Sequence, residues 1–256
     1  MRVVAIASRK GGSGKTTSAV SLAAAFGAAG RRALVVDLDP QGSASAWLRA
    51  PTDGPGLFEV FTEGAQLVEA IRKTGAGGVS IVPASPKLAG IEKALSDEVG
   101  PERIFAEAIA ALPKDAADVV LIDSPPSLGL LSVSALVAAR FVVVPTEATP
   151  LALGGVADLL KTVESVRRRL NRSLEVAGVL VCRADHRRNL TAESIGLLRE
   201  HHGALVLRAV VRESVRVAEA PSHGLTLEEY DPHGDAAEDY RAAARELGGR
   251  IWKGKA

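Results

Sequence analysis

A glycine-rich loop near the start of the chain constrains the fold more than any other feature. Residues 10–17 read Lys-Gly-Gly-Ser-Gly-Lys-Thr-Thr, after the apolar run Val3–Ala7 and before a helical pattern over Ser18–Ala29. A strand, a glycine-rich loop and a helix in this order form the context of a phosphate-binding loop, in which backbone N–H groups hold an anion. The pattern therefore predicts a nucleoside-triphosphate site in an α/β domain.

Each position of this loop suits contact with a nucleotide. Lys15 can reach the β- and γ-phosphate oxygens, and the Thr16 hydroxyl can bind Mg²⁺. Glycines allow the backbone N–H groups to turn inward and form an anion-binding nest. We expect the following residues to contact the cofactor: Lys10, Gly11, Gly12, Ser13, Gly14, Lys15, Thr16 and Thr17.

The start of the loop departs from the common pattern G-x-x-x-x-G-K-[ST]. Arg9 stands where that pattern has glycine, and Lys10 adds a second lysine. Lys10 is badly placed for the phosphate that Lys15 holds, and it is well placed to point outward toward a nucleotide in another subunit. The alternative interpretation is a solvated loop lysine with no such role.

Size and composition favour one domain that needs no crosslinks. The chain has 256 residues, a net charge of +1 and one cysteine, Cys182. A disulfide framework within the chain is therefore excluded, and a reducing cytoplasm is expected. The longest uncharged apolar stretch, Leu128–Ala139, is far shorter than the ~20 residues of a membrane span. We expect a single domain over residues 1–256, no stable membrane insertion, and Cys182 as a buried apolar side chain.

Apolar runs of strand length alternate with helical patterns along the whole chain. Candidate strands are Val3–Ser8, Ala33–Asp37, Val79–Pro83, Val119–Asp123, Phe141–Pro145, Val176–Cys182 and Ala204–Leu207. Candidate helices are Thr17–Ala29, Pro101–Leu112, Leu130–Ala139, Ala152–Leu170, Thr191–His202 and Asp235–Gly249. This alternation predicts a doubly wound, mostly parallel sheet with helices on both faces, the fold of P-loop NTPases, with ligands at the carboxyl ends of the strands.

Acidic side chains follow two of these strands. Asp37 and Asp39 end the second strand before Pro40, and they fall on the same side of an extended chain. Asp123 ends the apolar run Val119–Ile122, in the manner of the strand that holds Mg²⁺ in phosphate-loop enzymes. We expect Asp123 to bind the metal through water. The alternative for the Asp37–Asp39 segment is an ordinary junction between a strand and a loop.

Taken together, these segments resemble the ParA/Soj-type deviant-Walker ATPases, which are relatives of MinD. The resemblance rests first on Lys10–Thr17, Asp37–Gln41 and Asp123–Leu128. It continues in the C-terminal half, where Asp185–Thr191 is similar to the family's D-x-R-T-x-L-S segment and Val215–Gly224 to its V-R-x-S-E-A-P-S-H-G segment. Tyr230–Pro232 and Ala237–Tyr240 resemble the family's ending. The resemblance therefore covers nearly the whole chain.

The resemblance implies an ATP-dependent switch. Members of this family bind ATP and Mg²⁺, form a nucleotide-sandwich homodimer and bind double-stranded DNA without sequence preference. A ParB-like partner at centromere-like sites stimulates slow hydrolysis, and the cycle segregates chromosomes or plasmids. By position, Lys10 would contact the partner's nucleotide, Lys15 the phosphates, and Asp39 would activate water. The implied location is cytoplasmic and nucleoid-associated.

Basic residues in two segments correspond to the family's DNA contacts. The resemblance assigns this role to Arg187 and Arg216, and Arg188 replaces a threonine of the family pattern. Glu213 stands where a basic residue is frequent, so Arg188 and Arg212 are expected to restore local positive charge. The segment before the phosphate loop is too short for a helix-turn-helix domain, so sequence-specific operator binding is not expected.

Two other functions use related chains. A positioner of protein cargo would use the same DNA-bound cycle with a different partner, and the sequence does not separate it from DNA segregation. A MinD-like division regulator would need a C-terminal amphipathic helix that binds a membrane. Asp235–Gly249 has the pattern of a final packed helix with few residues after it, which disfavours that alternative.

Overall fold

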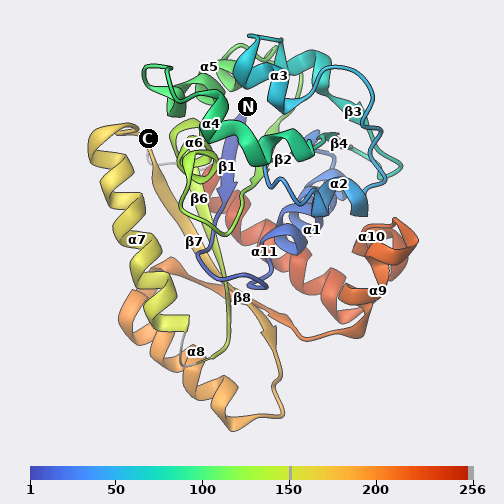
Figure 1. The fold of residues 1–256 in the computed structure, drawn as a ribbon. Helices are drawn as coiled ribbons and strands as arrows, with labels where there is room; N and C mark the ends of the chain where they lie inside the picture. Colours follow the sequence, from blue (N-terminus) through green and yellow to red (C-terminus); the bar gives the residue numbers. More distant parts are fainter. Residues whose placement is uncertain (150–151, 253–256) are drawn as a thin grey trace.

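In the computed structural model, which describes residues 1–149 and 152–252, a sheet of eight strands lies between two layers of helices (Figure 1). The strands are β1 (Arg2–Ile6), β2 (Ala33–Asp37), β3 (Arg72–Lys73), β4 (Val79–Val82), β5 (Val119–Asp123), β6 (Phe141–Glu147), β7 (Glu175–Ala184) and β8 (Val206–Arg212). Their order is β3-β4-β2-β5-β1-β6-β7-β8, with β3 antiparallel to β4 and the other neighbours parallel. The predicted doubly wound, mostly parallel sheet is confirmed.

Helices cover both faces of the sheet in the described part of the chain. They are α1 (Lys15–Ala28), α2 (Ser43–Trp47), α3 (Leu57–Thr62), α4 (Ile91–Ala94), α5 (Ile104–Ala110), α6 (Leu130–Ala138), α7 (Ala152–Arg169), α8 (Asn189–His202), α9 (Val215–His223), α10 (Leu227–Tyr230) and α11 (Asp235–Ile251). Short 3-10 turns occupy Leu67–Ala70, Pro86–Gly90, Pro101–Arg103 and Gly203–Leu205. None of these helices combines the length and the apolar character needed to cross a membrane.

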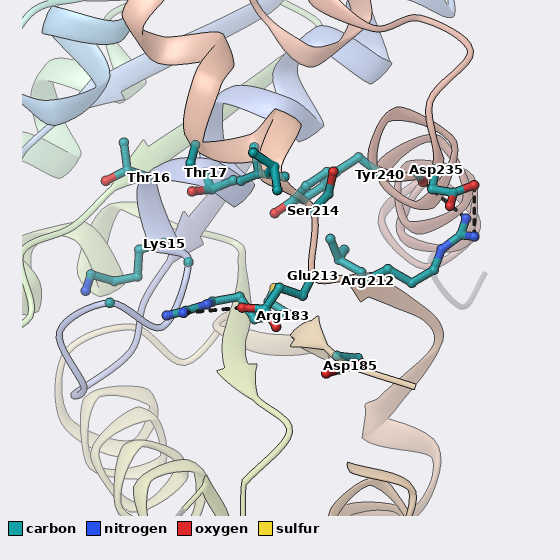
Figure 2. Close-up of a pocket in the computed structure, with 18 of the residues that line it drawn as sticks. Lys15, Thr16, Thr17, Arg183, Asp185, Arg212, Glu213, Ser214, Asp235 and Tyr240 are labelled. Atoms are coloured by element: carbon teal, nitrogen blue, oxygen red, sulfur yellow. Dashed lines mark hydrogen bonds and ion pairs between the residues drawn. The ribbon is translucent and has the colours of Figure 1, made fainter. Parts of the chain in front are cut away.

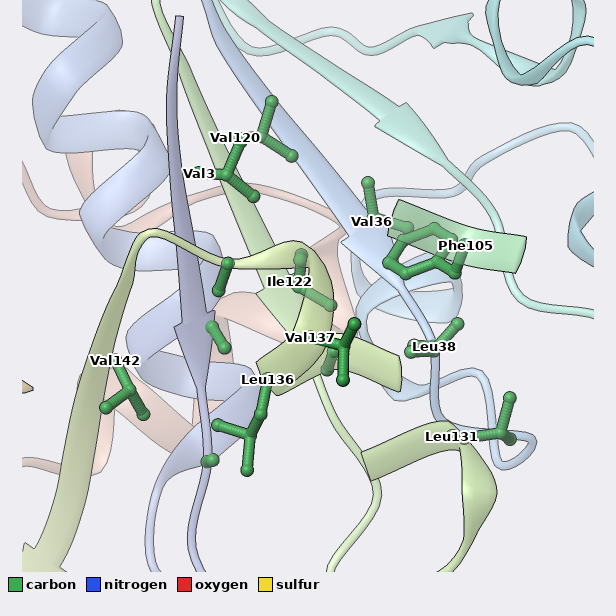
Figure 3. Close-up of a cluster of buried hydrophobic side chains, with 14 of the residues drawn as sticks. Val3, Val36, Leu38, Phe105, Val120, Ile122, Leu131, Leu136, Val137 and Val142 are labelled. Atoms are coloured by element: carbon green, nitrogen blue, oxygen red, sulfur yellow. The ribbon is translucent and has the colours of Figure 1, made fainter. Parts of the chain in front are cut away.

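The central strands are apolar on both faces because each face is covered by helices. Alternate side chains enter two separate cores, as the period of two in a strand requires. On one face, Val3, Val36 and Val120 pack with Phe105 of α5 (Figure 3). On the other face, the core is built from α1, α11 and the alternate strand residues, with Tyr240 fully enclosed. Burial on both faces explains why these strands lack polar residues.

Several element boundaries differ from those expected from the sequence. The seventh strand runs longer at both ends, and the eighth begins at Val206, after a 3-10 turn that includes Ala204. Arg208 in β8 is exposed, which is typical of an edge strand and breaks the apolar pattern. The helix expected over 101–112 is divided into a 3-10 turn and α5. The short helices α2, α3, α4, α9 and α10 and the two-residue strand β3 were not predicted.

Helix α1 touches a neighbouring turn through backbone atoms. A Cβ atom at Gly27 would lie 2.5 Å from the carbonyl oxygen of Gly77, and a Cβ atom at Gly78 would lie 3.0 Å from the Cα of Gly27. Gly78 also has φ +74, a conformation that favours glycine. The C-terminal half of α1 therefore rests directly on the turn that leads into β4.

Candidate nucleotide site

The phosphate loop leaves the carboxyl end of β1, in the middle of the sheet. Strand β1 lies between β5 and β6, so the chain connections diverge on its two sides at this point. Open α/β sheets bind their ligands at such switch points. A cavity of about 1130 Å³ opens here (Figure 2), large enough for a nucleoside triphosphate. The phosphate loop and Asp39 form one part of its wall, and residues 182–187 and 211–218 contribute to the rest.

Two glycines give the phosphate loop its shape. Gly12 has φ +77, and Gly14 has φ +90 where it caps the start of α1. A Cβ atom at Gly14 would lie 3.5 Å from the Cβ of Cys182, so β7 closes the back of the loop. Cys182 is 2% exposed, which confirms the expectation of a buried apolar side chain. The N-terminus of α1 and the loop thus face the cavity, as a phosphate-binding nest requires.

Lys15 begins α1 and lies among carboxylates. Its residue is 7% exposed and lines the cavity together with Thr16 and Asp39. Burial lowers the pKa of the Lys15 ammonium, while Asp123 and Asp39 act in the opposite direction. These residues come together as the sequence predicted. We propose that Lys15 binds the phosphates.

Asp123 is a buried carboxylate that fits a metal-linked role. It is the register partner of Asp37 on the adjacent strand, and both residues are fully buried. Neither oxygen of Asp123 has a hydrogen-bond partner among the described residues. Burial, followed by the charge of Asp37, raises the pKa of Asp123 to about 8. A nearby Mg²⁺ with its water shell would supply the missing partners, and Mg²⁺ is commonly held by one or two protein groups together with phosphates.

Asp37 and Asp39 do different things, although the sequence placed them on one side of the chain. One oxygen of Asp37 accepts from the backbone N–H of Ser45 at 2.7 Å and from its hydroxyl at 2.6 Å, which ties β2 to α2. Burial raises the pKa of Asp37 to about 6, against the effect of these hydrogen bonds. Asp39 lies beyond the strand, lines the cavity and accepts from the N–H of Gln41 at 3.0 Å. Of the two carboxylates, only that of Asp39 lines the cavity.

Lys10 lies on the surface beside the cavity. Its side chain is 54% exposed, and its ammonium binds the carboxylate of Glu147 at the end of β6. The same carboxylate accepts from Arg183 at 2.9 Å. Lys10 is not among the described residues that line the cavity. Neither Glu147 nor its ion pair with Arg183 was predicted from the sequence, because neither residue lies in a loop motif.

The arginines expected to bind DNA are exposed and paired with acids. Arg187 and Arg188, 89% and 71% exposed, both bind Asp185 before α8. Arg216, 54% exposed, contacts Glu219 at 2.8 Å and Asp231 at 3.8 Å. A DNA phosphate would compete with these acids for each arginine. The local charge is lower than the arginines alone suggest.

Arg212 was expected to add positive charge to a basic surface, but it is paired with two acids of α11. Its guanidinium binds Asp239 at 2.8 Å and Asp235 at 3.0 Å, both in α11. This contact joins β8 to α11.

The two loops that carry the other arginines are adjacent, because the N–H of Glu213 donates to the carbonyl of Ala184 at 3.1 Å.

The parallel sheet and the glycine-rich loop with its lysine and buried aspartate define a P-loop ATPase. The chain is 40% identical to the chromosome-partitioning ATPase Soj of Thermus thermophilus over 251 residues, covering 98% of this chain and 97% of that protein. It is 36% identical to the sporulation initiation inhibitor protein Soj of Bacillus subtilis, covering 96% and 98%. The chain belongs to the ParA/Soj family of chromosome-partitioning ATPases.

A family model described as an AAA domain matches residues 1–176.

Two solved structures share the fold and hold a nucleotide with magnesium. A Mycobacterium smegmatis structure, solved as cobyrinic acid a,c-diamide synthase with ADP and magnesium, has a TM-score of 0.86, 32% identity and coverage of 100% of this chain and 97% of that chain. The septum site-determining protein MinD of Pyrococcus horikoshii with Mg-ADP has a TM-score of 0.80, 26% identity and coverage of 99% and 97%. As a member of this family the protein is an ATP hydrolase, and both of these solved structures hold ADP and magnesium.

The Asp123→Asn variant is expected to stabilise the nucleotide-free protein at alkaline pH. The folded-state pKa of Asp123 is raised, so its contribution to stability is present below the unfolded pKa and is lost as the pH rises through about 8. The amide carries no buried charge, so urea denaturation at about pH 8.5 should show a gain of about 2 kcal/mol or more, since one pKa unit corresponds to ~1.4 kcal/mol. The gain should shrink toward about pH 5.

Asp118→Asn provides a control of opposite sign. Hydrogen bonds from Arg32 lower the pKa of Asp118 to about 2, so its contribution to stability is present above the unfolded pKa and is lost as the pH falls through about 2. That variant should not stabilise the protein at alkaline pH. Added Mg²⁺ and ADP should stabilise the parent more than Asp123→Asn. A loss of stability in Asp123→Asn at both pH values would contradict the buried-charge explanation.

Proposed function

We propose that this chain is a ParA-type partition ATPase whose ATP-bound homodimer binds DNA without sequence preference. The observation that carries the proposal is the position of Lys10. Its ammonium lies at the surface, outside the lining of its own cavity, and is held by Glu147. An exposed lysine at the edge of a phosphate loop is available to a nucleotide on a second copy of the chain. This supports a sandwich dimer in which Lys10 acts on the partner's nucleotide.

Within one protomer, we assign the remaining roles from the cavity. Lys15 and the phosphate loop hold the phosphates, and the Thr16 hydroxyl together with Asp123, through water, holds Mg²⁺. Bound Mg²⁺ neutralises charge on the phosphates. Asp39 lines the cavity and orients the attacking water. Because no arginine finger is found by motif, intrinsic hydrolysis is expected to be slow, on the order of 10⁻⁴–10⁻² s⁻¹ as in other switch NTPases.

DNA binding would follow from dimer formation. Two copies of Arg187, Arg188 and Arg216 on one dimer double the phosphate contacts available to a rigid duplex. The net charge of +1 gives a single chain little long-range attraction to DNA, so local arginines must supply the affinity. A ParB-like partner would stimulate hydrolysis and release the protein. In this cycle the ATP-bound form resides on the nucleoid in the cytoplasm and acts in chromosome or plasmid segregation.

A membrane-cycling role receives less support. Helix α11 is not available to a lipid surface, because it buries Tyr240, Ala243, Leu247 and Ile251 against the sheet and α1. Releasing it would expose the core. Binding to anionic vesicles that depends on ATP would nevertheless overturn the DNA proposal in favour of this alternative. A role in positioning protein cargo shares the DNA-bound cycle and differs only in the partner.

Arg216→Ala is expected to weaken DNA binding and reduce its salt dependence. Each phosphate neutralised adds about 0.9 to the slope of log K against log salt, so loss from both subunits should lower the slope by about 1.8. The measurement is a salt titration of duplex binding with ATP, with ADP and without nucleotide. Random and AT-rich duplexes of one length should bind alike.

Arg167→Ala is the matched control. Arg167 and Arg216 are exposed to similar extents, at 49% and 54%, and each pairs with a glutamate three residues away, but Arg167 lies in α7 away from the cavity. Arg167→Ala should leave the slope unchanged. Equal DNA binding in all three nucleotide states would refute the nucleotide switch, and strong preference for one duplex would refute recognition through phosphates.

A further inference from the structure

Arg183 has an unusual backbone at the end of a buried strand. The six residues before it in β7 are buried, whereas Arg183 itself is exposed. Its φ is +54, and Arg49 is the only other non-glycine residue with positive φ among the described residues. The register between β7 and β8 also shifts between Val181 and Ala184. Such irregularities re-aim a side chain and concentrate at functional sites.

The re-aimed side chain lies at the nucleotide cavity. Arg183 lines the cavity, and Figure 2 shows its guanidinium extending toward the side where Lys15 lies. One guanidinium nitrogen donates to Glu147 at 2.9 Å, and the other lies 3.7 Å from an oxygen of Glu213. The first contact is a hydrogen bond, and the second exceeds hydrogen-bond distance. The guanidinium nitrogen that faces Glu213 is therefore held less firmly than the nitrogen that donates to Glu147.

Charge at this end of the cavity makes an arginine useful. Glu147 and Glu213 place two carboxylates beside the space for an anionic ligand, and Arg183 lies between them. Without it, Glu213 would face the cavity with its charge uncompensated by Arg183 and would repel phosphates, whereas Glu147 would keep its ion pair with Lys10. A guanidinium is also planar, permanently charged and suited to bidentate contact with phosphate oxygens.

We propose that Arg183 is a nucleotide-binding residue that keeps Glu147 and exchanges Glu213 for the phosphate chain of ATP or ADP in its own cavity. The inference rests on the proposed ATP cycle and extends it to a residue outside the phosphate loop. It assigns Glu213 the opposite effect: this carboxylate competes with the nucleotide for the guanidinium. Removing the charge of Glu213 should then strengthen nucleotide binding.

Calorimetric titration of ADP and adenosine tests this assignment with two variants of opposite sign. Arg183→Gln should weaken ADP binding by about ten-fold, because a hydrogen bond to a charged group is lost, and should leave adenosine binding unchanged. Glu213→Gln should strengthen ADP binding about two-fold or more in the parent, by release of a competing ion pair. In the Arg183→Gln background, Glu213→Gln should have a smaller effect, since the competition no longer exists.

The pair Arg140 and Glu175 provides a matched control. It is also an exposed ion pair, at 2.6 Å, but lies at the amino ends of β6 and β7, away from the cavity. Arg140→Gln and Glu175→Gln should not change ADP affinity. Unchanged ADP affinity in Arg183→Gln or in Glu213→Gln would overturn the proposal, as would an equal loss of adenosine binding. Failure of the parent itself to bind ADP would instead refute the proposed ATP cycle.

Discussion

Asp39→Ala should stop ATP hydrolysis while leaving ATP-bound dimers intact. Asp39 lines the cavity beyond the end of β2, and we assign it to the attacking water. The phosphates would be held by Lys15 and the loop backbone, so their binding does not depend on this carboxylate. Loss of a group that positions or activates water should lower the hydrolysis rate about 100-fold or more. Long incubations with DNA and labelled ATP would measure this rate, and light scattering would measure the dimer.

Asp97→Ala is the control for that experiment. Asp97 is an exposed acid between α4 and α5, far along the chain from the loop motifs. It should retain both the parent rate and the parent dimer lifetime. If Asp39→Ala hydrolyses ATP at the parent rate, another residue activates the water. If it fails to bind ATP, Asp39 contributes to binding and our assignment is wrong.

Lys10→Ala should abolish the ATP-driven dimer without abolishing ATP binding. We assign Lys10 to the partner's nucleotide, so a symmetric dimer would lose two charged contacts at once. Each hydrogen bond to a charged group contributes ~1.5–3 kcal/mol, and the dimer dissociation constant should rise about 100-fold or more. The measurement is sedimentation in the Asp39→Ala background, where ATP persists.

Lys87→Ala is a close match to Lys10→Ala. Lys87 is 64% exposed and binds Glu59, as Lys10 is 54% exposed and binds Glu147, but Lys87 lies in the Pro86–Gly90 turn and not in the phosphate loop. It should dimerise as the parent does. If Lys10→Ala dimerises equally well, Lys10 is a solvated loop lysine. Its position then no longer supports the proposed partition cycle.

The sheet could be predicted because its strands are buried on both faces. Runs such as Val119–Asp123 carry no polar alternation, and their structural bounds match the expected ones. The edges were harder. In β8, exposed Arg208 interrupts the apolar pattern, and β3 contains only Arg72 and Lys73. Edge strands are stabilised by pairing with one neighbour, which a local pattern does not record.

In the candidate site, too, some contacts could be predicted from the sequence and others could not. The phosphate loop, Asp39 and Asp123 follow strands directly, and parallel strands bring them to one edge, so the sequence predicted their meeting. Lys10 and Arg183 both bind Glu147, and these contacts arise only from the order of β1, β6 and β7 in the sheet. The pairing of Asp37 with Ser45 likewise depends on how α2 folds back. Such contacts between distant segments leave no spacing pattern in one sequence.

The contact between Gly27 and the 77–78 turn limits how the helix behind the phosphate loop can shift. Helix α1 carries the phosphate loop at one end and at the other meets the turn with no side chain in between. A sliding motion of the helix toward this turn would drive backbone atoms together, so the helix that carries the phosphate loop is supported at its other end by direct backbone packing.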